Sequence, residues 1–413
     1  MRPTGRLHIG HYFGALENWV KLQNDPQYEC FFFVADWHAL TSDYADTSQV
    51  AQNTIEIGTD WLASGLDPAK CTVFLQSSVP EHAELQLLLS MVTPLGWLER
   101  VPTYKEALDN VKDKDLHTYG FLGYPILQSA DIVMYGDSDS ELVVPVGEDQ
   151  ASHVEIGREI VRRFNGFYGF GLKKDAFSDE NRGAMKWVTS PLDSVLVPKS
   201  GVPYTQDQKI KIEEHIRRNV REVGLKNFGA AESLAEVTWQ RPVLSEPNVM
   251  LTRTPRIPGL DGRKMSKSYG NAISLSESDA NIRAKTKVMV TDPARKRRTD
   301  PGNPDVCPVY DWHKLFSPPE TLAWSAAGCR SAGIGCIECK MAMADNLIKW
   351  IEPVRARREE YAAHPDKVLR ILDDGSVKAR EVAQKTMARV REAVFNWKEK
   401  REEVATPRVM GKS

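Results

Sequence analysis

Two short segments, far apart in the chain, combine residue types that suit the binding of a phosphate chain. His8 and His11 lie three positions apart around Ile9 and Gly10, at the expected start of an amphipathic helix. The free N–H groups at a helix start favour phosphate, and a glycine lets a nucleotide approach the backbone. Taken alone, such a pair is more typical of a helix cap or of a histidine pair in the core.

The second segment is the run KMSKS at residues 264–268, which follows Pro258, Gly259 and Gly262 and is therefore expected on a flexible loop. Two lysines beside small hydroxyl residues can reach a triphosphate as mobile point charges. An ordinary basic surface loop is the alternative interpretation of this run taken alone.

Elements that could position these segments alternate along the first part of the chain. Residues 30–36, 71–76 and 141–147 are short apolar runs that predict buried strands, and residues 47–64 carry apolar side chains at helical spacing. A strand, a helix and a strand joined by short connections predict a parallel sheet with crossover helices. Residues 376–403 predict a helix with an apolar stripe formed by Val382, Met387, Val390, Val394 and Trp397.

Composition excludes several classes of protein. No apolar run approaches the roughly 20 residues that span a bilayer, and the N-terminus carries no apolar signal region. We therefore expect a soluble, cytoplasmic protein with no membrane partner. The formal net charge is −2, but residues 276–413 hold 26 Lys and Arg against 20 Asp and Glu. Such a basic part suits either a polyanionic partner or a solvated helical surface.

The two segments in this order resemble the signatures of class I aminoacyl-tRNA synthetases, and neighbouring runs narrow the resemblance. PTGRLHIGHYFGALENWV, YPILQSADIVMYG, VVPVGEDQASHVEIGREIVRRFN and DGRKMSKSYGN are similar to the bacterial tryptophanyl-tRNA synthetase family. The resemblance implies an α/β fold with a Rossmann-type parallel-sheet catalytic domain and a C-terminal all-helical anticodon-binding domain. It also implies a homodimer that activates tryptophan with ATP and Mg²⁺ and then charges its tRNA.

On this basis the chain divides into five expected parts. They are a catalytic domain at 1–165, an insertion or subdomain at 166–248, the KMSKS region at 249–275, a helical anticodon-binding domain at 276–404 and a tail at 405–413.

The resemblance also assigns roles to residues of this chain. His8 and His11 are expected at the transferring phosphate, and Lys264 and Lys267 are expected to stabilise the departing pyrophosphate. The residues expected to contact ATP are Pro3, Thr4, Gly10, His11, Lys105, Gly147, Glu148, Asp149, Ile257, Lys264, Met265, Ser266, Lys267 and Ser268. The residues expected around tryptophan are Tyr124, Gln128, Asp131, Val144, Val146 and Gln150.

Asp131 is the most informative of the tryptophan residues. It interrupts a small, apolar run, where an isolated buried carboxylate is costly, and an indole N–H would give it a partner. Without the resemblance, Asp131 would first be interpreted as a helix cap or as one partner of a tertiary salt bridge. Because tyrosine-specific synthetases also use a carboxylate near the side chain, a tyrosine substrate remains an alternative.

Four of the six cysteines cluster in sequence at Cys307, Cys329, Cys336 and Cys339, with the spacing C-x21-C-x6-C-x2-C. In a cytosolic protein this pattern favours a metal over disulfides, and four thiolates suit zinc or an iron–sulfur cluster. The set resembles that of family members with a four-iron four-sulfur cluster beside the anticodon-binding region. The nearby basic run of Arg295, Lys296, Arg297 and Arg298, together with Trp312, is therefore expected to contact RNA.

Two further functions remain open from the residues. A small-molecule nucleotidyltransferase would share the phosphate site but lack the helical part and the metal site. A non-catalytic, RNA-binding paralogue would not need His8, His11, Lys264 and Lys267.

Overall fold

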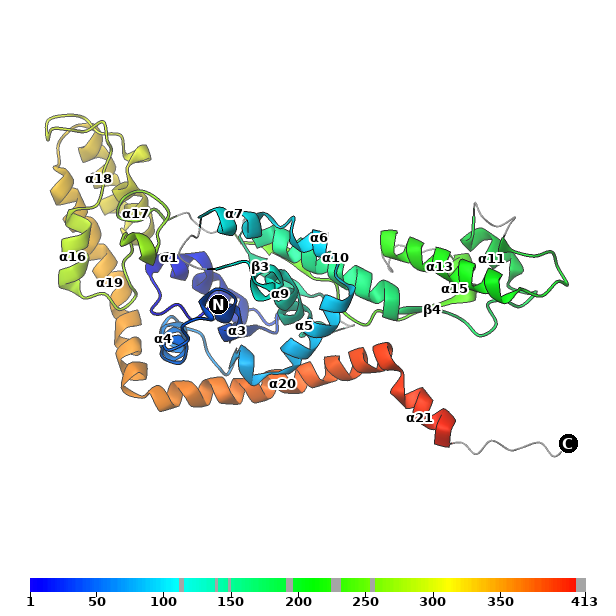
Figure 1. Cartoon of the computed structure of the whole chain (residues 1–413). Coiled ribbons are helices and arrows are strands. Elements are labelled where there is room, and N and C mark those ends of the chain that lie inside the picture. Colours follow the sequence, from blue (N-terminus) through cyan, green and yellow to red (C-terminus); the bar gives the residue numbers. More distant parts are fainter. Residues whose placement is uncertain are drawn as a thin grey trace. The chain divides into compact units, whose positions relative to one another are not determined.

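The computed structural model describes residues 1–110, 115–137, 140–147, 150–190, 196–223, 232–252 and 257–405 (Figure 1). The chain divides into two compact units, which are described one at a time. Unit 1 comprises Met1–Ser78 and Thr252–Lys378, and unit 2 comprises Val79–Leu251 and Ala379–Ser413. The boundaries predicted from the sequence, after residues 165, 248, 275 and 404, divide the chain by function and not by compactness, so they stay a prediction.

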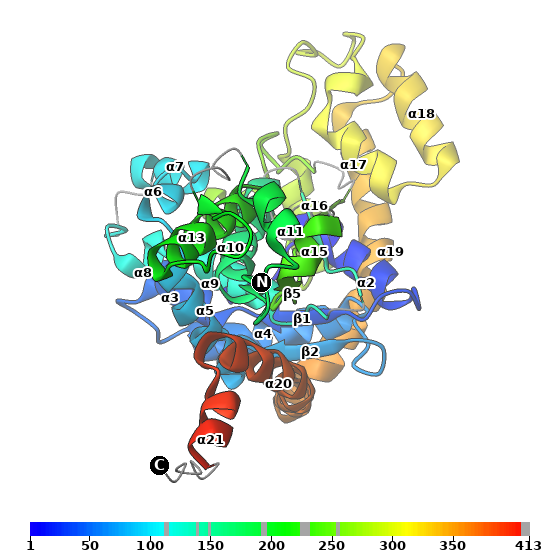
Figure 2. The same cartoon turned by 90° about the vertical axis from the view of Figure 1, so that its right-hand side faces the viewer.

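Unit 1 contains a parallel pair of strands with a crossover helix. Its elements are α1 (Ile9–His11), η1 (Tyr12–Leu16), α2 (Glu17–Gln23), β1 (Phe31–Val34), α3 (Asp36–Asp43), α4 (Val50–Ala63), β2 (Thr72–Leu75), η2 (Gln76–Ser78), η4 (Lys267–Tyr269), α16 (Asp279–Lys287), η5 (Pro304–Val306), α17 (Pro308–Phe316), α18 (Pro319–Arg330), α19 (Cys336–Ala363) and the first part of α20 (Pro365–Phe395). Strand β1 pairs with β2, Phe31 opposite Thr72, which confirms the predicted strand–helix–strand unit. Helices α16, α17 and α18 pack against α19 (Figure 2).

Two distant segments of unit 1 pair through their backbones. His8 forms an isolated antiparallel bridge with Ser274, and the N–H of Leu275 donates to the carbonyl of Leu7 at 2.9 Å. The N–H of Ile9 donates to Ile273 at 3.0 Å. The histidine segment is thereby joined to the strand-like run that follows the KMSKS loop.

A buried carboxylate holds the histidine segment from the other side. Asp60 on α4 is 1% exposed, and its two oxygens accept from the N–H of Leu7 and from Nε of Arg358 on α19, each at 2.6 Å. Arg358 also pairs with Glu56, which in turn accepts from Arg6 at 3.0 Å. One ionic network therefore joins α4, α19 and the residues that precede His8.

Unit 2 is mainly helical. Its elements are α5 (Glu81–Val92), α6 (Leu95–Leu98), α7 (Pro102–Asn110), α8 (Tyr119–Leu122), α9 (Tyr124–Val133), β3 (Val143–Val146), α10 (Ala151–Tyr168), β4 (Phe170–Leu172), α11 (Arg182–Val188), α13 (Gln206–Val223), α15 (Glu232–Val237), β5 (Thr238–Gln240), β6 (Asn248–Leu251), the second part of α20 and α21 (Trp397–Ala405). Strand β3 pairs in parallel with β6, and β4 pairs antiparallel with β5. Side chains between Phe170 and Val237 form a hydrophobic cluster of their own.

The predicted C-terminal helix is present but ends earlier than the apolar stripe suggests. Met387 and Val390 are buried, whereas Trp397 is 57% exposed, which corrects its assignment to the stripe. The cause is Asn396, whose φ of 49° breaks the helix between α20 and α21. Within the described part of the chain, no helix is long and apolar enough to cross a membrane.

Gly375 on α20 provides a test of how this helix packs on β2. A Cβ atom there would overlap the carbonyl oxygen of Val73, and the neighbouring Ser376 Oγ accepts from the N–H of Leu75 at 3.3 Å. We predict that Gly375→Ala lowers the free energy of unfolding by about 1–3 kcal/mol, since overpacking outweighs the helix propensity gained. Thermal unfolding followed by circular dichroism measures this effect.

The matched control is Gly183→Ala on α11, where an added Cβ meets nothing within 4 Å. This variant should be as stable as the parent or slightly more stable. Equal effects of the two substitutions would contradict close packing of α20 on the β2 backbone.

Candidate active site

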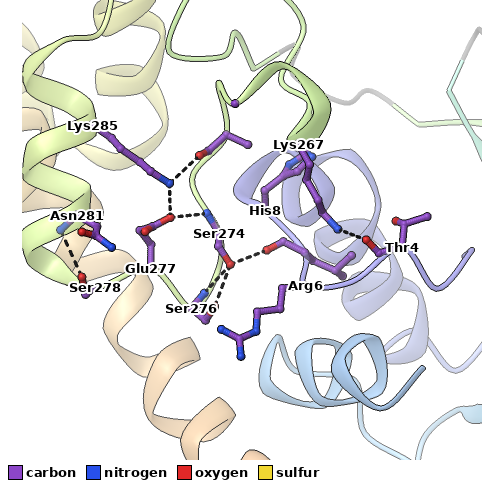
Figure 3. Close-up of a pocket in the computed structure, with 13 residues that line it drawn as sticks. Thr4, Arg6, His8, Lys267, Ser274, Ser276, Glu277, Ser278, Asn281 and Lys285 are labelled. Atoms are coloured by element: carbon purple, nitrogen blue, oxygen red, sulfur yellow. Dashed lines mark hydrogen bonds and ion pairs between the residues drawn. The ribbon is translucent and has the colours of Figure 1, made fainter. Parts of the chain in front are cut away.

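The backbone pairing around His8 brings the two signature segments to one polar cavity in unit 1. The cavity has a volume of about 560 Å³, and Thr4, Arg6, His8, Lys267 and Lys285 are among its lining residues (Figure 3). Arg6 pairs with Glu56 and Lys285 pairs with Glu277, whereas Nζ of Lys267 donates to the backbone carbonyl of Thr4 at 2.9 Å. The lining holds three cations and one carboxylate, a balance that suits an anion.

The two histidines are packed against each other and are uncharged near neutral pH. Their ring centroids lie 3.7 Å apart, and the N–H of His8 donates to Nδ1 of His11 at 3.2 Å. Burial and then the charge of Lys267 lower the pKa of His8 to about 4. Burial, His8 and Lys267 lower the pKa of His11 to about 3. Each imidazole can therefore offer one N–H to a ligand without adding positive charge.

Two observations indicate that this site fits a ligand held close to the backbone. Nδ1 of His8 is buried and has no hydrogen-bond partner among the described residues. A Cβ on Gly10 would lie 2.9 Å from that atom and 3.3 Å from the sulfur of Met265, so no larger residue fits there. A phosphate oxygen or a ribose hydroxyl that reaches this position would satisfy a buried polar atom.

The KMSKS loop is shaped by Asn271, a residue that the sequence analysis missed. Its side chain accepts from the N–H of Ser266 at 2.8 Å and donates to the carbonyl of Lys264 at 3.1 Å and to Asp261 at 2.7 Å. Gly259 approaches Asn271 so closely that a Cβ would clash. An Asn beside glycines in a loop was the available signal, because its amide can bond to the backbone on both sides.

The predicted ATP residues of unit 1 include members of the KMSKS loop and residues that precede it in the chain. Met265 and Ile257 are buried in the core, Pro3 is buried, and Lys264 is exposed. Ser268 lies in η4, and its side chain is outside the description.

The predicted tryptophan residues lie in unit 2, where α9 carries three of them on one face. Tyr124, Gln128 and Asp131 follow each other at helical spacing. Oδ1 of Asp131, which is 3% exposed, is hydrogen-bonded to Nδ1 of His82 at 2.6 Å. Oε1 of Gln128 is hydrogen-bonded to Nδ1 of His153 at 2.8 Å. Asp131 therefore has a histidine partner on α5, and Gln128 has one on α10.

His82 and His153 were missed by the sequence analysis. Their only sequence signal is a histidine within an amphipathic helix, which is more often a core residue than a ligand, and His82 lies 49 positions before Asp131.

The remaining predictions for unit 2 are spread over several elements. Val144 and Val146 occupy alternate positions of β3, the N–H of Gln150 donates to Gly147 at 3.0 Å, and Lys105 is exposed on α7. Glu148 and Asp149 lie outside the described residues.

The four clustered cysteines lie at the ends of helices in unit 1. Cys307 precedes α17, Cys329 is on α18, and Cys336 and Cys339 form the first turn of α19. Burial and then the other three thiols raise the pKa of Cys339 to about 12, so the sulfur of Cys339 lies within electrostatic reach of the other three. In the described ranges, however, no three His, Cys, Asp or Glu side chains are arranged to hold a metal ion.

Two residues expected to contact RNA are instead part of the core. Trp312 is 0% exposed, and its Nε1 donates to the carbonyl of Pro258 at 2.9 Å. Arg295 is 9% exposed, donates to the carbonyl of Ile334 at 2.6 Å and lies 3.9 Å from Sγ of Cys329. Both predictions are wrong, because both side chains are buried in the protein and donate hydrogen bonds to backbone carbonyls. Residues 296–298 of the same basic run are exposed.

Comparison with known proteins agrees with these features. The family model described as tRNA synthetases class I (W and Y) matches residues 1–180 and 206–352. The tryptophan–tRNA ligase of Ralstonia nicotianae is 47% identical over 396 residues, which cover 95% of this chain and 96% of that protein. The tryptophan–tRNA ligase of Thermotoga maritima is 42% identical over 95% of this chain and 97% of its own length.

A solved structure extends the likeness to the fold. The tryptophanyl-tRNA synthetase from Campylobacter jejuni, determined with ADP and tryptophan, has a TM-score of 0.70 and 26% identity and covers 95% of this chain and 98% of its own. This likeness confirms the predicted α/β class with a Rossmann-type catalytic domain and a helical C-terminal region. The chain therefore belongs to the class I tRNA synthetases of the tryptophan and tyrosine family.

Proposed function

We propose that the chain activates L-tryptophan with ATP and transfers the product to its tRNA. The observation that carries this proposal is the meeting of His8 and Lys267 at one cation-lined cavity, where a buried nitrogen of His8 has no hydrogen-bond partner among the described residues. Tryptophan, rather than tyrosine, is supported by the tryptophan–tRNA ligases that match over most of the chain.

The reaction needs charge stabilisation more than covalent chemistry. The carboxylate of tryptophan attacks the α-phosphorus of ATP, the bond to the β-phosphate breaks, and pyrophosphate leaves. A terminal ribose hydroxyl of tRNA then takes the aminoacyl group and releases AMP. Neutral His8 and His11 donate N–H groups to the phosphate oxygens, and Lys264 and Lys267 neutralise the pyrophosphate. Mg²⁺ enters bound to the phosphates of ATP, whose charge it shields.

Asp131 selects the substrate in this proposal. As a buried carboxylate it accepts a hydrogen bond from the indole N–H, while Tyr124, Gln128, Val144, Val146 and Gln150 surround the remainder of the amino acid. An analogue without that N–H leaves a buried charge with one bond fewer, which gives strong discrimination.

The helical part at 276–404 contacts the tRNA, a role that is consistent with a cytoplasmic enzyme. The exposed side chains of Lys296, Arg297 and Arg298 supply positive charge there.

Cys307, Cys329, Cys336 and Cys339 hold a four-iron four-sulfur cluster in this proposal, with zinc as the alternative. An all-thiol donor set drawn from the ends of three helices fits either group chemically. Gly302 leaves room beside Cys329, since a Cβ there would lie 2.6 Å from its sulfur. The bound group would supply a structural link between α17, α18 and α19, and the buried guanidinium of Arg295 would offset the charge of the thiolates.

A homodimer is supported by an apolar surface on unit 2. Leu87 and Met91 lie one turn apart on α5, Leu95 follows on α6, and they are 52%, 71% and 58% exposed. Exposed apolar side chains this close in the chain indicate a contact surface, and a second copy of the chain is its proposed partner.

Amino-acid-dependent exchange of pyrophosphate into ATP tests the activity. We expect exchange with tryptophan but not with tyrosine, and a fall of about 10²–10³-fold in Lys267→Ala because a stabilising charge is lost. Lys211→Ala, in an exposed ion pair on α13, is the control and should keep full exchange. Exchange with tyrosine alone would overturn the Asp131 assignment, and no exchange with either would favour the RNA-binding paralogue.

Iron and sulfide analysis after anaerobic purification tests the cluster. Cys336→Ser and Cys339→Ser should lose iron and visible absorption and should charge tRNA poorly, while tryptophan-dependent exchange persists. Cys71→Ser, which changes a buried thiol in another part of unit 1, should keep the iron. Stoichiometric zinc in place of iron would refute the iron–sulfur assignment but retain a four-thiolate site.

Light scattering coupled to size-exclusion chromatography tests the dimer. The parent should elute as a dimer and Met91→Glu as a monomer, because a charge would be buried against an apolar partner. Val288→Glu introduces the same charge at an apolar side chain that is 77% exposed in unit 1, and it should remain dimeric. A monomeric parent would rule out this surface as a dimer contact.

A further inference from the structure

His82 is a fully buried histidine whose two ring nitrogens both have hydrogen-bond partners. It is 0% exposed, near the start of α5. Nδ1 lies 2.6 Å from Oδ1 of Asp131, and Nε2 lies 2.6 Å from the hydroxyl of Tyr135. The three side chains form a chain of hydrogen bonds that ends on the carboxylate proposed to select the substrate.

The proton positions in this chain follow from Asp131. An ionised carboxylate can only accept hydrogen bonds, so the ring N–H of a neutral His82 is at Nδ1 and donates to Asp131. Nε2 is then the acceptor for the hydroxyl of Tyr135, which defines one tautomer. Burial, followed by the negative charges of Asp131 and Glu81, raises the pKa of Tyr135 far above its usual range, so the hydroxyl has a proton to donate.

The charged residue next to His82 in the chain has its own partner within unit 2. The adjacent Glu81 is 5% exposed, and Nε of Arg380 donates to its two oxygens at 3.0 and 3.2 Å. Glu81 therefore has a cationic partner of its own, and Asp131 is the carboxylate bonded to the imidazole.

We propose that His82 is a positioning residue for tryptophan recognition, which orients the carboxylate of Asp131 and keeps it an acceptor for the indole N–H. A hydrogen bond donated to one carboxylate oxygen favours the ionised form and fixes the rotation of the group. Without that donor the buried carboxyl group would take up a proton more readily, and a protonated carboxyl can itself donate to a ring atom that carries no hydrogen. The site would then discriminate less well between an amino acid whose ring carries an N–H and one whose ring lacks it. The inference rests on the proposed role of Asp131.

The test compares tryptophan with its isostere in which sulfur replaces the indole N–H, β-(3-benzothienyl)alanine, in the pyrophosphate-exchange reaction. The readout is the ratio of kcat/KM for the two amino acids, with the KM for ATP as a check that the protein is folded. We expect His82→Leu to lower this ratio by at least about tenfold, in line with the loss of a specific polar contact. His82→Asn should restore most of the ratio, because its amide can donate from about the position of Nδ1.

Tyr135→Phe is the second variant, in case His82→Leu does not fold. It removes one oxygen atom and leaves the imidazole free to place its proton on Nε2, so the ratio should fall while the KM for ATP stays unchanged. An unaltered ratio in His82→Leu, or in folded Tyr135→Phe if His82→Leu fails to fold, would overturn the inference. A parent protein that does not distinguish the two amino acids, or an unchanged ratio in Asp131→Asn, would instead refute the role of Asp131 itself.

Discussion

The carboxylate of Asp60 is the constraint on which the organisation of unit 1 depends. It is inaccessible to water and has two obligatory partners, the backbone N–H of Leu7 and the guanidinium of Arg358. Burial raises its pKa, against the opposing effects of Arg358 and the Leu7 amide. Removing one member of such a buried pair leaves the other uncompensated, at a cost of about 3–5 kcal/mol. The position of His8, one residue after Leu7, therefore depends on a helix that belongs to the opposite end of the sequence.

The cavity proposed for the phosphates separates hydrogen-bond donors from charges. His8, which lines the cavity, and the adjacent His11 are uncharged because burial and Lys267 both disfavour the imidazolium form. The positive charge that acts on the histidines consequently resides on Lys267, in a loop whose backbone is organised by Asn271. Rigid neutral donors at a helix start and a movable cation opposite them suit a reaction in which charge shifts from a carboxylate to a leaving pyrophosphate.

Local patterns predicted the elements better than the contacts between them. The apolar runs at 30–36 and 71–76 and the helical spacing at 47–64 were sufficient for a parallel pair with a crossover helix, because burial and periodicity are local properties. The pairing of Leu7 with Leu275 and the bond between His82 and Asp131 join residues far apart in sequence, and no local pattern encodes them. Trp312 and Arg295 were misassigned for the converse reason, since their residue types suit RNA but composition does not reveal that both side chains are buried.

The hydrogen bond from Lys267 to the carbonyl of Thr4 gives the ammonium group a partner inside the protein before any ligand arrives. Because an ammonium group has three N–H donors, a phosphate could share the lysine with this carbonyl or replace the carbonyl as a competitor. A bond between two ionised groups is stronger than one in which only the lysine is charged, so an anion at this place would prevail. Where the phosphate replaces the carbonyl, the apparent affinity would reflect the difference between the two bonds. Since this competitor is main chain, replacing the side chain at position 4 does not remove it.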